Sequence, residues 1–341
     1  MSKTDAAVSS RVLGCGLDPG TMNIVSARRA EKGVEIKRVR DALLDLPSES
    51  EKMLRLSKGN CQQRGEDLLI LGDAAFEFAN VFGREVRRPL SAGLVSSSDM
   101  DAMGVLGILI KSVLGEPLVK GEHCYFSIPA PPVDRPGQDV VYHRGVLDRI
   151  VRECGYTPTA SNEAMAVIYS ETAKEGFSGV ALSFGSGMSN VALSVNALEG
   201  LSFSVARGGD WIDAGAAKSM GMTQARMCSM KERGIDLNNP IGREQEAVVF
   251  YYRNLVEYVI DQIAIQFKAV EGRFSLPKAI PMVVSGGTST VGGFMAFFQE
   301  VFDKKRKRFP IEVSEIRAAS DPMNAVALGL LVQAMQETDD V

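Results

Sequence analysis

Apolar and polar residues alternate in blocks along the chain, and the first clear block predicts a strand, a tight turn and a second strand. Residues 12–27 form an apolar run, then Asp18-Pro-Gly-Thr21, then another apolar run. Apolar runs on either side of a Pro-Gly pair predict a hairpin. Gly20 would let the backbone come close to a ligand, and turn amides beside Thr21 could donate to phosphate oxygens. Asp18 would face the same space, where a hydrated divalent cation needs an acceptor.

The same layout recurs in the second half of the chain, at residues 180–195. Three positions correspond in the two stretches: Asp18 with Ser183, Gly20 with Gly185, and Thr21 with Ser186. A strand-turn-strand unit repeated in each half predicts two similar lobes that face each other across a cleft. Two Gly-rich hairpins in that arrangement could hold a polyphosphate between them.

Further elements follow each hairpin in a similar order. Strands are expected at residues 33–39, 123–128, 201–206, 280–285 and 311–313. Helices are expected at residues 98–114 with Ser98 as N-cap, 138–154, 161–174, 223–232, 243–270 and 293–302, and from Asp321 with Pro322 at an N-terminal position. The apolar stripe of residues 243–270 is typical of core packing.

This order predicts an α/β protein of two lobes. The first lobe is expected at residues 11–160, with a small inserted subdomain at about 35–85. The second is expected at residues 161–335, with a helical inserted subdomain at about 214–275, and residues 1–10 and 336–341 are expected to be flexible tails.

Composition narrows the class of protein. The 341 residues are 45% hydrophobic and 23% charged, with a net charge of −4 that gives no reason to expect nucleic-acid binding. The five cysteines form no C-x-x-C pair, which disfavours zinc and a disulfide framework and fits a reducing, cytoplasmic location. No signal peptide or membrane-spanning segment is expected. The basic run 304–308 is interpreted as a solvated helix end, and His123 and His143 as structural.

Five short segments occur in the order and at the separations found in one known family. They are Asp18-Pro-Gly-Thr-Met-Asn23, Gly185-Ser-Gly-Met-Ser189, Gly208-Gly-Asp-Trp-Ile-Asp213, Ser285-Gly-Gly-Thr288 and Asp321-Pro-Met-Asn-Ala-Val326, with Arg88-Pro-Leu-Ser-Ala-Gly-Leu-Val95 as a sixth, weaker match. The set resembles the actin-like ATPase superfamily, and within it the bacterial actins such as MreB and MamK. The resemblance covers residues 11–335 or so and implies duplicated ribonuclease-H-like domains, each with an inserted subdomain, around a nucleotide cleft.

The resemblance implies ATP or ADP with Mg²⁺ in that cleft, and Asp18 on the side of the metal. The implied nucleotide contacts are Asp18, Gly20, Thr21, Met22, Asn23, Gly185, Ser186, Gly187, Met188, Ser189, Gly208, Gly209, Asp210, Lys231, Glu232, Gly286, Gly287 and Thr288. Glu163 matches the acid that positions attacking water, but it is equally explained as a first-turn carboxylate stabilised by the helix dipole. Lys231 and Glu232 could also be ordinary solvated helix residues.

One departure from the family affects the expected chemistry. The second phosphate loop usually opens with Asp, and here that catalytic position is Ser183, which can hydrogen-bond but carries no charge. Because phosphoryl transfer depends on charge around the transferring group, the substitution predicts weak metal binding or slow hydrolysis.

Three functions follow as hypotheses. The first is a filament-forming ATPase with slow turnover, in which copies of the protein bind one another head to tail. The second is a non-polymerising scaffold or adaptor protein with little or no catalysis. The third is a small-molecule kinase, for which no convincing catalytic Asp is found. Adaptor proteins are possible partners, and the sequence leaves membrane contact open.

Overall fold

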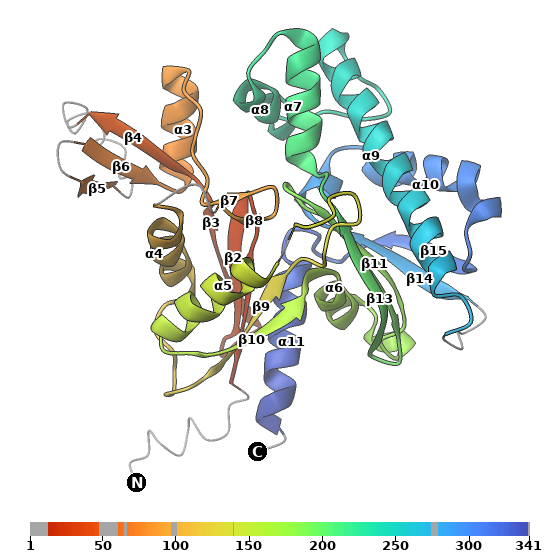
Figure 1. Ribbon diagram of the computed structural model, residues 1–341, viewed down its shortest axis with the longest axis horizontal. Coiled ribbons are helices and arrows are strands. Elements are labelled where there is room, and N and C mark those ends of the chain that lie inside the picture. The colour runs from red at the N-terminus through yellow and green to blue at the C-terminus, as the bar shows by residue number, and fades with distance from the viewer. Residues whose placement is uncertain are drawn as a thin grey trace.

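Two five-stranded sheets lie at the centres of two lobes in the part of the chain that the structure describes (Figure 1). The computed structural model describes residues 13–47, 61–64, 67–96, 101–138, 140–273 and 279–339. The expected N-cap Ser98 lies outside these residues. The two sheets confirm the predicted α/β architecture, and their strands occur in the same spatial order.

The first sheet has the order β10-β9-β1-β2-β3. Its strands are β1 (Cys15–Pro19), β2 (Asn23–Arg29), β3 (Val34–Arg40), β9 (His123–Ile128) and β10 (Thr157–Asn162). The first three form an antiparallel meander, and β9 and β10 continue the sheet in parallel to β1. The apolar runs around the Pro-Gly pair therefore do form a hairpin, as their pattern predicts.

The second sheet repeats this topology in the order β13-β12-β11-β14-β15. Its strands are β11 (Gly179–Phe184), β12 (Ser189–Val195), β13 (Leu198–Val205), β14 (Ile280–Ser285) and β15 (Val313–Ala318). A meander of three strands is again followed by two strands parallel to the first. The chain thus contains two copies of one strand arrangement, which is the duplication that the repeated hairpin indicated.

Helices cover both faces of the sheets. On the first sheet lie α4 (Ala102–Leu114) and α5 (Val141–Glu153), and over the second sheet lie α9 (Gly242–Ala269) and α10 (Phe294–Lys305). Between the sheets lie α6 (Glu163–Glu171) and α11 (Ala325–Asp339), which pack on each other (Figure 1). The expected C-terminal stop of α4 at Gly115 and the N-cap of the later helix at Thr223 are confirmed.

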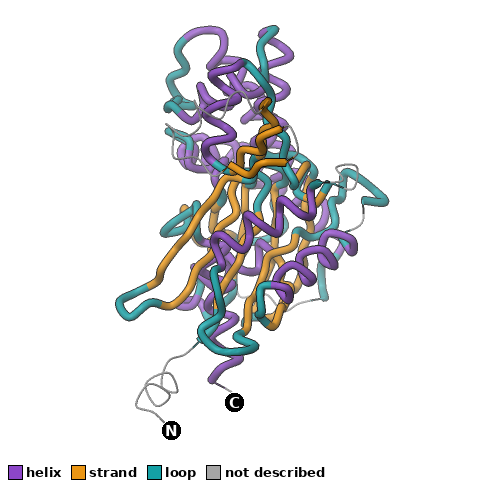
Figure 2. The backbone as a smooth tube through the Cα atoms, turned by 90° about the vertical axis from the view of Figure 1, so that its left-hand side faces the viewer, coloured by secondary structure: helices purple, strands orange, loops and turns teal. Residues whose placement is uncertain are grey.

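One smaller unit extends each lobe on the side away from the chain ends (Figures 1 and 2). On the first lobe it consists of β4 (Leu43–Pro47), β5 (Cys61–Arg64), β6 (Asp67–Leu71) and α3 (Asp73–Phe82), with the short strands β7 (Leu90–Ser91) and β8 (Leu94–Val95) below. On the second lobe it consists of α7 (Gly209–Met220) and α8 (Gln224–Glu232) beside the start of α9. Single 3-10 turns are η2 (Ala173–Glu175), η3 (Gly287–Thr290) and η4 (Arg306–Arg308).

Some boundaries differ from the sequence expectations. The last helix begins at Ala325, so Pro322 lies before it rather than in its first turn. The carbonyl of Pro322 instead accepts the amide of Gly286 at 2.9 Å and the hydroxyl of Ser285 at 3.1 Å. These contacts hold residues 321–324 as a turn against the end of β14, before the helix begins. The strand expected at 311–313 begins only at Val313 and continues to Ala318.

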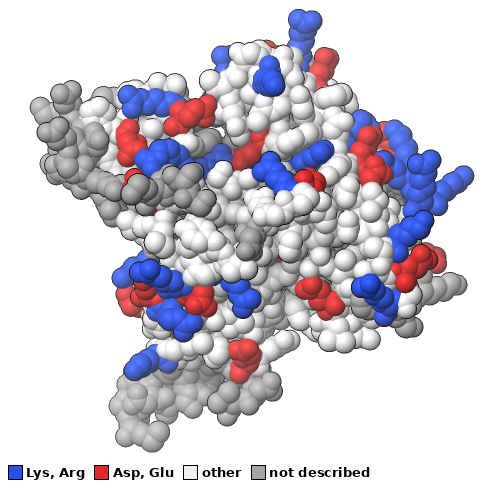
Figure 3. Space-filling view, viewed as in Figure 1, with Lys and Arg blue, Asp and Glu red and all other residues white. Residues whose placement is uncertain are grey.

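The basic run at the end of α10 gathers as Lys and Arg side chains at the right of Figure 3. Lys304 pairs with Glu300 at 2.5 Å and Lys305 pairs with Asp261 at 2.6 Å. These neighbours offset part of the charge, as expected for a solvated helix end. Among the described residues, no helix has the length and apolar character needed to cross a membrane.

The two lobes meet through an unusually close approach of backbones at α11. A β-carbon on Gly329 of α11 would lie 1.7 Å from the carbonyl oxygen of Ala166 in α6. A β-carbon on Gly16 of β1 would lie 2.2 Å from the carbonyl oxygen of Ala327. Because backbone cannot give way as a flexible side chain does, both positions need glycine.

We therefore expect Gly329→Ala to destabilise the protein by about 1–3 kcal/mol, because the added methyl must push two helices apart. Gly104→Ala in α4 is the matched control, since a β-carbon there meets nothing within 4 Å. The control should be neutral or stabilise by about 0.5–1 kcal/mol through helix propensity. Thermal unfolding of both variants measures the difference, and equal melting temperatures would refute the close-contact argument.

Candidate functional site

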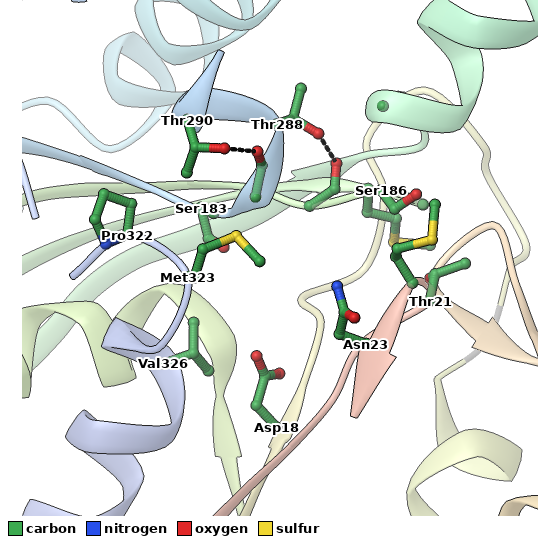
Figure 4. Close-up of a pocket in the computed structure, with 18 of the residues that line it drawn as sticks. Asp18, Thr21, Asn23, Ser183, Ser186, Thr288, Thr290, Pro322, Met323 and Val326 are labelled. Atoms are coloured by element: carbon green, nitrogen blue, oxygen red, sulfur yellow. Dashed lines mark hydrogen bonds between the residues drawn. The ribbon is translucent and has the colours of Figure 1, made fainter. Parts of the chain in front are cut away.

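A cavity of about 360 Å³ lies between the two lobes and is lined by both repeated hairpins. Of the sequence-predicted residues it brings together Asp18, Gly20, Thr21, Met22, Asn23, Glu163, Ser183, Gly185, Ser186, Gly187, Met188, Gly209, Lys231, Glu232, Gly286, Gly287 and Thr288. Figure 4 shows Asp18 and Asn23 on one side of this space and Thr288 and Thr290 on the other. Residues from distant parts of the chain therefore converge on one cavity that is open to solvent.

The two hairpin turns are held by the same hydrogen bond. The amide of Gly20 donates to the carbonyl of Asn23 at 3.0 Å, and the amide of Gly185 donates to the carbonyl of Met188 at 2.9 Å. A β-carbon on Gly20 or Gly185 would lie 2.8 or 2.9 Å from that carbonyl oxygen. The glycines thus allow tight turns whose remaining amides are free to face a ligand.

The loop between β7 and β8 joins the two hairpins. The amide of Gly93 in this loop donates to the Thr21 hydroxyl at 3.1 Å. A β-carbon on Gly187 would lie only 2.3 Å from the same Gly93 nitrogen. Gly93 therefore touches both turns at once, and it lines the cavity although the sequence analysis did not select it.

Two acidic side chains face the cavity from its floor. Asp18, at the end of β1, accepts a hydrogen bond from the Ser127 hydroxyl at 2.7 Å, and burial raises its pKa to about 6. Its second oxygen makes no hydrogen bond to the described residues, and Figure 4 shows the carboxylate pointing into the space. A carboxylate oxygen in that position suits a hydrated Mg²⁺, which usually takes one or two carboxylates together with substrate phosphates.

Glu163 opens α6, directly after its N-cap Asn162. Its carboxylate accepts hydrogen bonds from the Ser183 hydroxyl at 2.7 Å and from the Asn190 amide nitrogen at 2.8 Å. Burial, followed by the nearby charge of Asp18, raises the pKa of Glu163 to about 8. The charged forms of both acids are therefore disfavoured, and a bound cation would favour them again.

Asn190 is a site residue that the sequence analysis missed. It is the cross-strand partner of Ser183 in the second hairpin, and its side-chain oxygen is buried without a hydrogen-bond partner among the described residues. A buried oxygen without a hydrogen-bond partner is unfavourable. The hydrogen bond from the Asn190 amide nitrogen to Glu163 holds the side chain there despite this cost. The signal was available in principle, because residues facing Ser183 across a predicted hairpin share its side of the sheet.

The opposite end of the cavity is formed by the second lobe. The Thr288 hydroxyl donates to the carbonyl of Gly185 at 2.9 Å, and this bond ties the glycine turn after β14 to the second hairpin. Lys231 in α8 binds both oxygens of the buried Asp213, at 2.7 and 2.8 Å. Its ammonium group is therefore held in place at the cavity wall, with its charge largely matched.

Two ion pairs cross from one lobe to the other. Arg40 of β3 binds both carboxylate oxygens of Glu232 in α8, at 3.0 and 3.1 Å. Arg88 binds both oxygens of Asp210 in α7, each at 2.8 Å. These paired contacts join the smaller units of the two lobes on the side of the cavity away from the chain ends (Figure 1).

Three predicted residues do not line the cavity. Asp210 instead binds Arg88 and accepts from the Ser186 hydroxyl at 2.8 Å, so it supports the second hairpin from behind. Ser189 donates to the carbonyl of Arg207 at 2.8 Å, and a β-carbon on Gly208 would lie 2.5 Å from the Gly185 carbonyl oxygen. Cavity-lining residues that the sequence analysis did not select include Gly93, His143, Thr290, Pro322, Met323 and Val326.

The raised pKa of Glu163 predicts how stability changes with pH. Its ordinary value is 4.5 and its value here is about 8, so the folded protein binds the proton more tightly than the unfolded chain. Stability should therefore fall as the pH rises from 4.5 toward 8, by on the order of 1.4 kcal/mol per pKa unit.

The neutral variant Glu163→Gln should lack this decline. Without nucleotide or metal, we expect it to melt above wild type at pH 9, with the gap closing by pH 5. Melting curves that stay parallel over this range would contradict the assignment of a raised pKa to Glu163.

Comparison with known proteins identifies a family to which this sequence is similar. Residues 13–334 match the family described as Volactin, whereas no curated protein matches the sequence significantly. The fold is similar to that of a MamK double helical filament, with 17% identity over 94% of this chain and 98% of that chain and a TM-score of 0.69. It is also similar to MreB5 of Spiroplasma citri bound to ADP, with 15% identity over 97% and 98% of the two chains and a TM-score of 0.65.

A third similar structure is the ethanolamine utilization protein EutJ from Carboxydothermus hydrogenoformans. It has 16% identity over 94% of this chain and 89% of that chain, with a TM-score of 0.54. Identities this low establish the fold and leave the activity open. The duplicated sheets and these structural matches confirm a bacterial actin-like fold, and the match over residues 13–334 shows that the chain belongs to the Volactin family.

Proposed function

We propose that this protein binds ATP with Mg²⁺ between its lobes and assembles with copies of itself into filaments. The observation that carries the proposal is the pair of hairpins, each closed by the same amide-to-carbonyl bond and each lining one cavity. The similarity to MreB5 bound to ADP supports a nucleotide in this position. The similarity to a MamK filament supports self-association.

The residues suit the parts of such a ligand. Turn amides beside Thr21 and Ser186 would donate to phosphate oxygens, and Asp18 would hold waters of the metal ion. When bound, the ion would neutralise phosphate charge and lower the pKa of the nearby acids. Gly287 and Thr288 would enclose the adenosine, beside Lys231.

In this proposal, Glu163 orients and polarises an attacking water. Its two hydrogen-bond donors, Ser183 and Asn190, are both neutral, so the charge that the family's usual Asp would add is absent. Electrostatic stabilisation of charge that develops in the transition state is often the largest catalytic contribution. Slow hydrolysis coupled to assembly is therefore the expected chemistry, in a filament that we place in the cytoplasm.

Self-association into a filament requires a head-to-tail contact that does not close into a ring. Such contacts use two different surfaces of one subunit, which a two-lobed molecule provides at its opposite ends. The main partner of the subunit is then a second copy of itself, and adaptor proteins are further partners.

The first test measures nucleotide binding and assembly together. Adding Mg²⁺ should strengthen ATP binding by about tenfold or more in wild type, the value of one contact to a charged group, and should have no such effect in Asp18→Asn. Isothermal titration gives both affinities.

Sedimentation and electron microscopy with ATP should then show filaments of wild type. A protein that binds no purine nucleotide, or stays monomeric at high concentration with ATP, contradicts the respective half of the proposal.

A non-polymerising scaffold is the second candidate function, and Ser183 is the observation that favours it. Ser183 is almost fully buried, and its hydroxyl donates a hydrogen bond to Glu163. As an uncharged side chain, it offers no negative charge to a metal ion. A scaffold of this kind would keep the nucleotide and the two-lobed shape with little turnover.

Phosphate release by wild type and Ser183→Asp separates the two functions. Restoring the carboxylate should raise the turnover rate by about tenfold or more if wild type is limited by missing charge. Ser183→Asn, which is similar in size and uncharged, is the control and should not raise it. A wild-type rate typical of filament-forming relatives would refute the scaffold function.

A further inference from the structure

His143 occupies an unusual place for a residue interpreted as structural. It lies in the first turn of α5, it is only 2% exposed, and the little surface that it keeps lines the cavity. The buried residues Val146 and Leu147 lie three and four positions further along and share its face of the helix. A small apolar residue would fill this helix position without placing a polar group at the cavity wall.

The hydrogen bonding of His143 fixes which of its nitrogens can act as a donor. The amide of Val95 donates to Nδ1 at 3.2 Å, so Nδ1 is an acceptor. Burial lowers the pKa of His143 to about 4, which keeps the ring neutral at physiological pH. A neutral imidazole has one proton, so the N–H must be on Nε2. No described residue accepts a hydrogen bond from it.

The contact with Val95 also places His143 next to the two hairpins. Val95 ends β8, and the loop before it contains Gly93, which binds Thr21 and touches Gly187. His143 therefore stands behind the loop at which both turns meet. This is the end of the cavity where the turn amides are, away from the adenosine-side residues of η3.

The charges around the cavity explain why a neutral donor is useful there. Lys231 is the one Lys or Arg among the described residues that line the cavity, and Asp213 already binds it through two contacts. The acids on the floor, Asp18 and Glu163, supply no positive charge. A phosphate bound at this end must therefore be held mainly by neutral N–H and O–H donors and by its metal ion.

We propose that His143 donates a hydrogen bond from Nε2 to an oxygen of the terminal phosphate of the bound nucleotide, or of the free phosphate that replaces it. The proposal rests on nucleotide binding in the interlobe cavity. It assigns His143 to the recognition of the third phosphate, so that the donor discriminates between a nucleoside triphosphate and a diphosphate.

Two substitutions separate the two nitrogens of the ring. In His143→Asn the side-chain oxygen can still accept from Val95, but the donor at the cavity is lost. In His143→Gln an amide N–H can reach the place of Nε2, while the acceptor for Val95 is displaced. His123→Asn is the matched control, because His123 is the only other histidine in the sequence and does not line the cavity.

The affinities for a non-hydrolysable triphosphate and for the diphosphate, both with Mg²⁺, are measured by isothermal titration. His143→Asn should weaken triphosphate binding by about tenfold, because a hydrogen bond to a charged group is lost, and should change diphosphate binding by less than about twofold. His143→Gln should retain the preference for triphosphate even if it melts earlier, and His123→Asn should match wild type. Inorganic phosphate titrated into the diphosphate complex tests the free ion as the source.

Several outcomes overturn the proposal. Equal losses for triphosphate and diphosphate in His143→Asn would assign His143 to structure alone. Unchanged binding of both triphosphate and inorganic phosphate in that variant would remove it from the site. A preference lost in His143→Gln but kept in His143→Asn would point to the Val95 contact instead. If wild type binds no nucleotide, the proposed function fails as well, whereas normal nucleotide binding with an unaffected His143→Asn refutes this inference alone.

Discussion

The backbone contact between α11 and its two neighbours is the constraint on which the rest of the structure depends. Gly16 lets α11 lie directly on the first sheet, and Gly329 lets the same helix lie directly on α6, which packs on the second sheet. One helix thereby sets the distance and angle between two otherwise separate cores. The hairpins at the ends of β1 and β11 face each other because the sheets that carry them are fixed in this way. A cavity between two domains needs such a firm pivot before any residue in it can act.

The chemistry of the cavity follows from what is buried with it. Asp18 and Glu163 are held close together away from water, and neither is stable as an anion without a counter-charge. The protein itself offers little counter-charge, because the positive charge of Lys231 is already paired with Asp213. A ligand that arrives with its own cation would complete the electrostatics, and neutral donors would then define its orientation. The proposed metal-bound polyphosphate is consistent with this charge distribution.

Much of the fold could be predicted because its signals are local. A Pro-Gly turn between apolar runs specifies a hairpin, and its recurrence at residues 180–195 indicated the second lobe. The start of α11 was mispredicted because Pro322 and its neighbours bond to the β14 segment, a contact that helix-start rules do not include. The contact of Asn190 with Glu163 and the place of His143 at the cavity were not predicted, because both depend on segments that only folding brings together. The ion pairs of Arg40 and Arg88 likewise join residues more than a hundred positions apart.

These interlobe ion pairs make part of the contact between the lobes sensitive to dissolved salt. Arg40–Glu232 and Arg88–Asp210 lie above the cavity and are partly open to solvent. Attraction between partly exposed charges weakens as dissolved ions screen it, over a range of about 10 Å at 0.1 M salt. The pivot at α11 is made of close apolar and backbone packing, which screening does not affect. The lobes are therefore joined by two kinds of contact: the packing at α11 is insensitive to ionic strength, whereas the ion pairs of Arg40 and Arg88 weaken as the salt concentration rises.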